Sequence, residues 1–399
     1  MQYLKPISNS TAAALVCAAF LLLPCLRLGA QSGAEYTVTG HIFDSETKAP
    51  LYLANVFLSN TTWGAASDEN GAFRIDRVKP GVYQMVITMM GYEKQVRPVV
   101  IPRTRQQSIP VFLKPTVYNM ESVAVEAEVP REWHRHLDRF KREFLGMSVN
   151  AQNTIIENPE VLDFSADRMS GLFRAVSAGP LHVENNALGY RITFFMQSFN
   201  AKTAAYLRYT GEARFIPMDP PDKETQALWE KNRRTAYEGS IVHFFKSALQ
   251  GRSRREGFFM YILEHGIDTE MPDYSKPVLP DTLILPGKNP HEFLVFLPKY
   301  AMIIYNNENE PETYKQFIGS DKKRPGSRYI EKSIHSGTEY QISYVSTEFS
   351  PLTVYETGHL YTPDLFSAAG YWTWERIADM LPLNYEPPQQ NSRPSAEQQ

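Results

Sequence analysis

Side chains suited to acid–base chemistry gather at one place, the run His182-x-Glu184-Asn185-Asn186. Residues two apart on a strand face the same side, so a histidine at 182 could act as a general base and the glutamate at 184 could orient it. The alternative is a strand end and turn in which the polar groups are satisfied locally. We favour this alternative and keep His182 and Glu184 as candidate catalytic residues.

The motifs of common catalytic and cofactor sites are absent from the sequence. It contains no G-x-S-x-G, no H-E-x-x-H, no phosphate loop and no G-x-G-x-x-G. His134 and His136 are two apart on an expected helix, so they face different ways and cannot share a metal as an i, i+4 pair would. We therefore predict no cofactor, no metal and no enzymatic activity, and we keep a hydrolase centred on the second domain as the alternative.

The stretch "ASDENGAF" raises the question of a calcium loop. With Gly71 as the sixth residue of an EF-hand loop, Asp68 would be third and Asn70 fifth. Ala66 would then be first and Arg77 twelfth, where acidic ligands are required. The stretch therefore predicts a tight turn between two strands, with Asn-Gly at its centre.

Composition limits the class of protein. A chain of 399 residues, 43% apolar and 12% aromatic, is long enough for two or three domains with buried cores. Its 41 basic and 44 acidic residues give a formal charge of −3, so the basic surface of a nucleic-acid-binding protein is not expected. Trp229, Trp372 and Trp374 could stack on a carbohydrate, although such rings more often belong to a core.

Residues 1–30 are expected to be a signal peptide. Lys5 precedes an apolar run, and "LGAQ" offers cleavage after Ala30. Arg27 ends the run short of the roughly 20 apolar residues that a membrane span needs. We therefore expect export to the periplasm or the outer membrane, with no transmembrane span in the mature chain.

The two cysteines, Cys17 and Cys25, both lie inside this leader. Cleavage after Ala30 would leave a mature chain without thiols, which excludes disulfides, a cysteine nucleophile and cysteine metal ligands. An alternative is a lipoprotein anchored through Cys25 as an accessory of an outer-membrane uptake receptor. Pro24 stands where a lipoprotein site needs a small residue, so we favour the signal peptide.

Residues 36–115 have the pattern of an all-β sandwich. Short alternating runs rich in Val, Ile, Phe and Tyr are separated by glycine-containing turns at regular spacing. Expected strands cover 38–42, 54–59, 72–75, 83–89, 94–101 and 108–113. The turn residues between them are Asp68, Asn70, Gly71, Pro80, Gly81 and Gly91.

The same residues carry a resemblance to a known family. The matching positions, in order, are Gly40-x-Ile42-x-Asp44-x-x-Thr47-x-x-Pro50, Ala54-Asn55-Val56, Thr62-x-Gly64, Asp68-x-x-Gly71-x-Phe73, Pro80-Gly81-x-Tyr83 and Gly91-Tyr92. This set resembles the carboxypeptidase-like regulatory domain, a transthyretin-like β-sandwich found beside metallocarboxypeptidases and in outer-membrane receptors of Bacteroidota. The resemblance implies a non-catalytic accessory domain. Ala49, where the family usually has glycine, is the main departure.

Residues 131–385 are expected to form an α+β domain, mainly of antiparallel strands, after a linker at 116–130 that could hold one more strand at 122–127. Trp133, Leu137, Phe140 and Phe144 make one apolar stripe on an opening helix. Strands joined at Asn185-Asn186 and at Gly211 follow, then helices at 224–239 and 240–251, further strands, and a last helix at 370–382. Residues 386–399 are expected to be a disordered tail.

The order of these segments, from the regulatory-type domain to "GYWTWERIADMLP", resembles exported Bacteroidota proteins of unknown activity. We therefore predict an exported, non-catalytic binding or scaffold protein of the cell envelope. Its expected partner is an envelope protein or a glycan, and nucleic acid is not expected.

Overall fold

The computed structural model describes residues 35–102, 108–116, 131–202, 206–267, 272–320, 340–361 and 365–388. The expected signal peptide with Cys17 and Cys25, the expected strand at 122–127 and the tail beyond 388 lie outside these residues. From Tyr36 onward the chain belongs to one compact unit.

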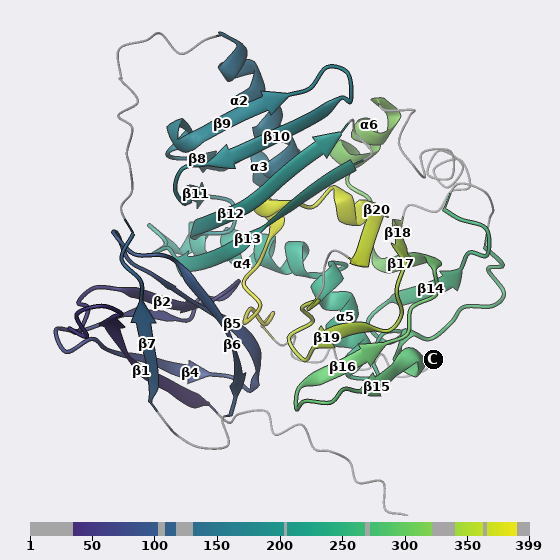
Figure 1. Cartoon of the computed structure of the whole chain (residues 1–399). Helices are drawn as coiled ribbons and strands as arrows, with labels where there is room; N and C mark the ends of the chain where they lie inside the picture. Colours follow the sequence, from purple (N-terminus) through teal and green to yellow (C-terminus); the bar gives the residue numbers. More distant parts are fainter. Residues whose placement is uncertain are drawn as a thin grey trace, which may run out of the picture. The chain divides into compact units, whose positions relative to one another are not determined.

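The first module is a sandwich of two sheets (Figure 1). One sheet has the order β4-β1-β7, from Ala72–Val78, Tyr36–Asp44 and Ile109–Leu113. The other has the order β3-β2-β5-β6, from Gly64–Ala66, Asn55–Leu58, Gly81–Thr88 and Gln95–Ile101. Alternate residues of each strand point inward, and Val38, Ile42, Val56 and Met85 meet in one buried cluster. The all-β sandwich predicted for this module is confirmed.

A six-stranded antiparallel sheet begins the second region. Its order is β8-β11-β12-β10-β9, from Thr154–Ile156, Leu181–Asn185, Tyr190–Lys202, Leu172–Ser177 and Leu162–Ala166, and β13 (Tyr206–Pro217) also pairs with β12. The first half of β12 pairs with β11 and its second half with β10, while β13 follows its whole length on the other side.

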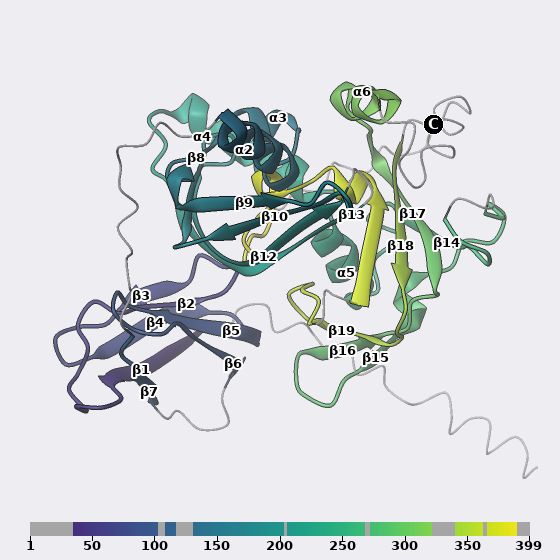
Figure 2. The ribbon, with the colours of Figure 1, turned by 45° about the horizontal axis from the view of Figure 1, so that its top comes forward.

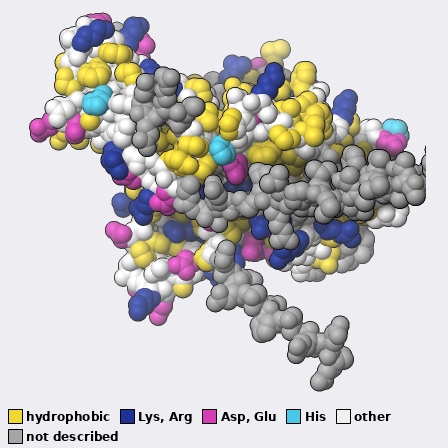
Figure 3. All heavy atoms as spheres, turned by 90° about the horizontal axis from the view of Figure 1, so that it is seen from below, with side chains coloured by type: hydrophobic (Ala, Val, Ile, Leu, Met, Phe, Trp, Pro, Cys, Tyr) yellow, Lys and Arg dark blue, Asp and Glu magenta, His cyan; other side chains and the backbone are white. Residues whose placement is uncertain are grey.

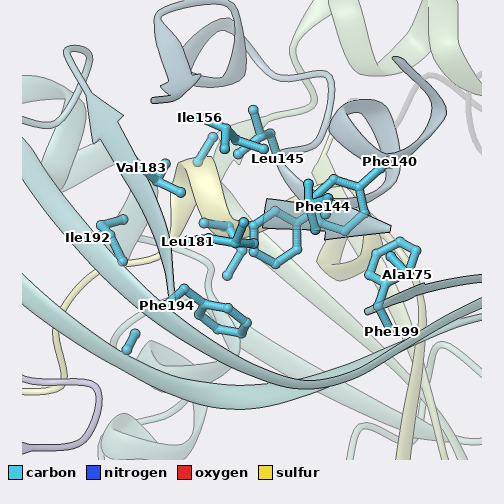
Figure 4. Packing of buried hydrophobic residues seen from close by; sticks show 14 of the residues in the cluster. Phe140, Phe144, Leu145, Ile156, Ala175, Leu181, Val183, Ile192, Phe194 and Phe199 are labelled. Atoms are coloured by element: carbon cyan, nitrogen blue, oxygen red, sulfur yellow. The ribbon is translucent and has the colours of Figure 1, made fainter. Parts of the chain in front are cut away.

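Helices α2 (Arg131–Phe144) and α3 (Val149–Gln152) lie on one face of this sheet (Figure 2). The stripe expected on α2 is buried there, with Phe140 and Phe144 fully covered. Their rings meet strand residues at short range: Phe140 lies 4.7 Å from Phe199 and Phe144 lies 5.2 Å from Phe194, centroid to centroid. Figure 4 shows these rings pointing into the same core as Leu181 and Ile192.

The rest of the region is built on two smaller sheets. Helices α4 (Lys223–Tyr237) and α5 (Ile241–Leu249) are separated by Gly239, which has φ 81°, and by Ser240, whose hydroxyl accepts from His243 N. The sheets have the orders β14-β17-β18-β20 (Phe258–Ile262, Tyr300–Asn309, Tyr340–Thr347, Phe366–Gly370) and β15-β16-β19 (Ile284–Pro286, Glu292–Val295, Leu352–Tyr355). Helix α6 covers Glu312–Ser320. The predicted α+β plan is confirmed.

The last helix, expected over 370–382, is not formed. Gly370 ends β20, and two short 3₁₀ turns follow, at Tyr371–Thr373 and Ile377–Asp379. Their side chains enter three separate cores: Trp372 packs beside α5, Trp374 packs in a cluster with Tyr371, and Ile377 packs beneath α2. One α-helix presents a single apolar stripe and could not supply all three, so tertiary packing overrides the helical pattern.

Gly211 is also not the turn that the sequence predicts. It lies inside β13 opposite Met196, next to an irregularity in the register with β12. A Cβ atom there would lie 2.5 Å from the carbonyl oxygen of Phe195. The glycine therefore permits a close approach of two strands, which is the second common role of glycine in a strand pattern.

The charged surface agrees with the small net charge. On the face drawn in Figure 3, basic, acidic and hydrophobic side chains are interspersed. Among the residues that the structure describes, none of the helices is long and apolar enough to cross a bilayer.

Replacing a buried ring of the α2 stripe should lower stability strongly. Phe144 is fully buried, so we expect Phe144→Ala to reduce the free energy of unfolding by about 3–5 kcal/mol. Leu228→Ala on the exposed side of α4 is the control and should change it by less than about 0.5 kcal/mol. Urea denaturation followed by circular dichroism measures both, and equal effects would contradict the packing described here.

Candidate functional site

The two candidate catalytic residues lie on the same side of β11 but do not form a working pair. His182 is exposed, and the Glu184 carboxylate accepts from Arg191 Nε at 3.3 Å and from Asn186 Nδ2 at 3.1 Å. Among the described residues, no hydrogen bond joins the side chains of His182 and Glu184. Because Glu184 is engaged elsewhere, it does not orient the histidine as a general base requires.

Asn185 explains why this polar run exists. Its side chain is fully buried, its Oδ1 accepts from the backbone N–H of Ala187 at 3.1 Å and of Leu188 at 2.9 Å, and its Nδ2 donates to the Ala378 carbonyl at 2.8 Å. One amide therefore shapes the β11–β12 turn and ties it to the C-terminal segment.

The carbonyls of the same turn are capped by helix α4. Trp229 Nε1 donates to Asn186 O at 2.7 Å and Asn232 Nδ2 to Ala187 O at 2.9 Å. Arg233 donates to Leu188 O at 2.6 Å and to Gly189 O at 3.1 Å. Gly189 has φ 67°, and a Cβ on it would lie 2.2 Å from the Trp229 ring. The run at 182–191 is thus a structural connection between sheet, helix and C-terminus.

The three tryptophans considered for carbohydrate stacking are core residues. Trp229, Trp372 and Trp374 are 5%, 5% and 4% exposed. Trp229 and Trp372 also use their indole N–H groups internally, the latter on the Gly239 carbonyl at 2.7 Å. A sugar ring needs an accessible aromatic face, so these rings belong to the core, as the sequence favoured, and do not serve as carbohydrate platforms.

Another polar pair, the buried His243 and the half-buried Glu256, is also structural. His243 Nε2 lies 2.8 Å from Glu256 Oε2, and its Nδ1 accepts from the Gly239 N–H at 3.1 Å. Both ring nitrogens are therefore occupied, which leaves none to take a proton from a substrate. Within the described ranges, no group of three or more His, Cys, Asp or Glu side chains could hold a metal ion.

Of the turn residues expected in the sandwich, Asp68, Asn70, Gly71, Pro80 and Gly91 lie between strands, whereas Gly81 is the first residue of β5 and pairs with Ile101. Asp68 Oδ1 accepts from the N–H of Asn70 and of Ala72, both at 2.8 Å. Gly71 has φ 73°, and a Cβ on it would lie 2.4 Å from the Ile42 carbonyl oxygen. Gly91, between β5 and β6, has φ 81°. Between β4 and β5, just before Gly81, the Tyr83 hydroxyl donates to the carbonyls of Lys79 at 3.1 Å and Pro80 at 3.3 Å. This is turn chemistry and not cation binding.

The strongest constellation of polar contacts is one that the sequence did not reveal. Asn60, between β2 and β3, has φ 60° and uses its main chain and side chain to join the sandwich to the second region. Its N–H donates to Ala213 O at 2.7 Å, its Oδ1 accepts from Ala213 N at 3.3 Å, and its carbonyl accepts from Leu383 N at 2.7 Å. Asparagine tolerates this left-handed conformation better than most residues.

The residues after Asn60 extend the junction. Thr61 makes a parallel bridge with Arg214, and its carbonyl accepts from Phe215 N at 3.1 Å. The Thr62 N–H donates to Asn384 Oδ1 at 3.0 Å, and Asn384 Nδ2 donates to the Thr62 hydroxyl at 2.7 Å. The sandwich thus covers part of the free edge of β13, which would otherwise present unpaired backbone groups.

Side-chain contacts also join the sandwich to the second region. Val56 and Leu58 point into the sandwich core, whereas Phe57 points outward, yet it is only 1% exposed because its ring stacks 5.6 Å from Phe195. Lys94 pairs with Glu212 at 2.6 Å. The sequence signal for this contact was the unbroken apolar run of β2. In a sheet with one face in the core and one face outward, an outward-facing phenylalanine needs another surface to cover it.

The C-terminal segment ties the junction to helices α4 and α5. Lys246 Nζ donates to the carbonyls of Leu383 at 3.1 Å and Tyr385 at 3.4 Å, and burial lowers the pKa of this lysine to about 8. Arg234 Nη2 donates to Pro388 O at 2.9 Å. Hydrogen bonds from both α4 and α5 therefore hold the carbonyls of this segment.

Two carboxyl groups near the end of β17 have raised pKa values. Burial and the neighbouring Glu238, which ends α4, raise the pKa of Glu308 to about 7, and Gln341 Nε2 donates to Glu308 at 3.0 Å. Burial likewise raises the pKa of Glu310 to about 7. These groups are structural and sensitive to pH.

Comparison with known proteins identifies the first module. Residues 38–125 match the family model of the CarboxypepD_reg-like domain, which confirms the resemblance inferred from the spaced residues. No curated protein matches the chain.

Similarities to solved structures are partial. A chain in the crystal structure of a type II cohesin–X-dockerin complex from Acetivibrio cellulolyticus is 27% identical, with a TM-score of 0.15 and coverage of 20% of this chain and 51% of that chain. A protein of unknown function from Bacteroides fragilis is 14% identical, with a TM-score of 0.16 and coverage of 41% and 65%. At such TM-scores neither similarity bears on function.

Glu308 should make stability depend on pH. Its pKa is raised from 4.5 to about 7, so the folded state binds the proton more tightly than the unfolded chain. The stabilising effect of that proton is complete below pH 4.5 and is lost as pH rises to about 7. The difference in the free energy of unfolding between Glu308→Gln and the wild type should therefore change with pH. From pH 5 to pH 8 it should shift in favour of the variant, on the order of 1–2 kcal/mol after allowing for solvent screening.

Denaturation at the two pH values measures this difference. Glu46→Gln, on an exposed turn of the sandwich, is the matched control and should show no such change. A Glu308→Gln variant with the wild-type pH dependence would contradict the assignment.

Proposed function

We propose that this chain, whose residues 38–125 are a CarboxypepD_reg-like domain, is a non-catalytic binding or scaffold protein of the cell envelope. In this proposal the sandwich is a rigid docking module held on the second region. The observation that carries the proposal is the junction at Asn60, where one turn bonds simultaneously to strand β13 and to the C-terminal segment.

Energetic reasoning supports rigidity. A flexible tether between domains needs few contacts and is usually rich in Gly, Ser or Pro. Here backbone hydrogen bonds, a stacked aromatic pair and the Lys94–Glu212 ion pair act together. Because these contacts form together, the sandwich should keep one orientation.

The use of polar groups argues for binding over catalysis. Glu184, Asp68 and the pair His243 and Glu256 form their hydrogen bonds within the protein, and among the described residues no carboxylate orients the exposed His182. A general base or nucleophile needs a free functional atom in reach of a substrate. The second region therefore fits a scaffold or a receptor for a partner better than a hydrolase.

Rigidity is testable by spin labelling. The labels go on Thr39→Cys, on the exposed face of the sandwich, and on Arg174→Cys, on exposed β10, after both native cysteines are changed to serine. We expect one narrow distance distribution. Asn60→Ala, which strains the backbone and removes a side-chain bond, should broaden it, whereas the turn control Asn70→Ala should not. A broad distribution in the parent protein would refute the scaffold proposal.

The location is tested by the mature N-terminus. Export is supported by the basic start, the apolar run and the small residues before Gln31. Mass spectrometry of the protein from its native envelope should give a chain beginning at Gln31. A chain beginning with acylated Cys25 would instead establish the lipid-anchored accessory, and an uncleaved Met1 would contradict export.

A further inference from the structure

The end of the sandwich opposite Asn60 displays three large exposed apolar residues. Tyr52 is 51% exposed, Leu53 58% and Met90 91%. Because Asn55 pairs with Thr88, the chain positions just beyond this pair, Leu53 and Met90, leave the same end of the sheet. We call Tyr52, Leu53 and Met90 the apolar tip.

The loop that carries the tip is held firmly. Leu51 and Ala54, on either side of it, are 7% and 0% exposed. Ser67, itself buried, accepts through Oγ from Ala54 N at 2.9 Å, donates to Leu51 O at 2.6 Å and accepts through its carbonyl from Leu53 N at 3.0 Å. The exposed side chains are therefore presented on an ordered backbone, which lowers the entropy cost of binding.

The backbone conformation of Leu53 and the exposure of its side chain both cost the unbound protein free energy. Its φ is 62°, a left-handed conformation that costs a leucine free energy and that glycine or asparagine would adopt more easily. Its side chain also exposes apolar surface to water. Strain and exposed hydrophobic groups at one residue are typical of a surface kept for recognition.

The charges around the tip indicate the chemistry of its partner. Exposed Glu46, Asp68 and Glu69 lie in the turns at this end of the sandwich. The Nζ of Lys48 donates to Ser45 O and lies 5.0 Å from the Phe112 ring centroid. The lysines near Met90 are paired: Lys94, in the same turn, with Glu212, and Lys114 with Glu93. An acidic rim around an apolar centre is complementary to an apolar pocket edged by Lys or Arg, and it disfavours an anionic membrane surface.

We propose that the apolar tip is the docking surface of this protein for a partner protein that offers an apolar pocket with a basic rim. The proposal rests on the proposed scaffold function, because a sandwich fixed on the second region presents the apolar tip in one orientation. Tyr52, Leu53 and Met90 fill the pocket, and Glu46 and Glu69 set its orientation.

Site-specific photo-cross-linking in the source cells tests this. The full chain carries benzoylphenylalanine at position 52, or at Thr39 as the control position on the same sandwich. We expect position 52 to cross-link one protein, at a peptide containing apolar residues and Lys or Arg, with at least tenfold higher yield than position 39. Leu53→Asn should lower this yield at least tenfold while preserving or raising the melting temperature. Glu69→Lys should also lower it.

Matched variants separate the possible failures. Val176→Asn, at an exposed apolar residue of β10, should leave the yield unchanged. Equal yields at positions 52 and 39, cross-links only to lipid or to a second copy of this chain, or insensitivity to Leu53→Asn would each overturn the proposal. If the spin-label distribution stays narrow in those cases, the scaffold function survives. If it is broad, the scaffold function fails first.

Discussion

The arrangement of this protein depends on a single turn in the left-handed region of backbone space. At Asn60 the N–H, the carbonyl and the side-chain oxygen all bond across to the second region. A positive φ turns these groups away from the β2–β3 hairpin, in which they would otherwise pair. The same turn helps to cover the β13 edge and gives the C-terminal segment a bonding partner, so edge protection and domain docking meet at Asn60 and its neighbours Thr61 and Thr62.

The C-terminal segment connects the junction at Asn60 to the cores of the second region. Residues 371–379 place Trp372, Trp374 and Ile377 in three different cores, and Leu383 and Asn384 then reach the sandwich. Buried aromatic residues contribute large areas of apolar contact. A segment with such anchors in separate cores should couple their stabilities, since it cannot leave one without straining the others.

The sequence predicted what depends on local patterns. Period-two alternation and glycine turns gave the strands of the sandwich, and the stripe from Trp133 to Phe144 gave α2 with its buried face. It did not predict contacts that depend on distant residues. Gly211 has the composition of a turn, but its role is set by Phe195 on the neighbouring strand, and residues 370–382 have a helical pattern that packing overrides. The polar run at 182–186 suggested chemistry because the caps on its carbonyls come from α4, more than forty positions away.

Asn60 holds the sandwich on the second region through its N–H, its carbonyl and its side-chain oxygen. Amide hydrogen exchange of the full chain tests it most directly, through the Asn60, Phe215 and Leu383 N–H groups, each of which donates across the junction. We expect these amides to exchange slowly, at rates close to those of core strands such as β12, because they open only when the domains separate. Exchange as fast as that of the Glu69 amide, in an exposed turn of the sandwich, would contradict this expectation.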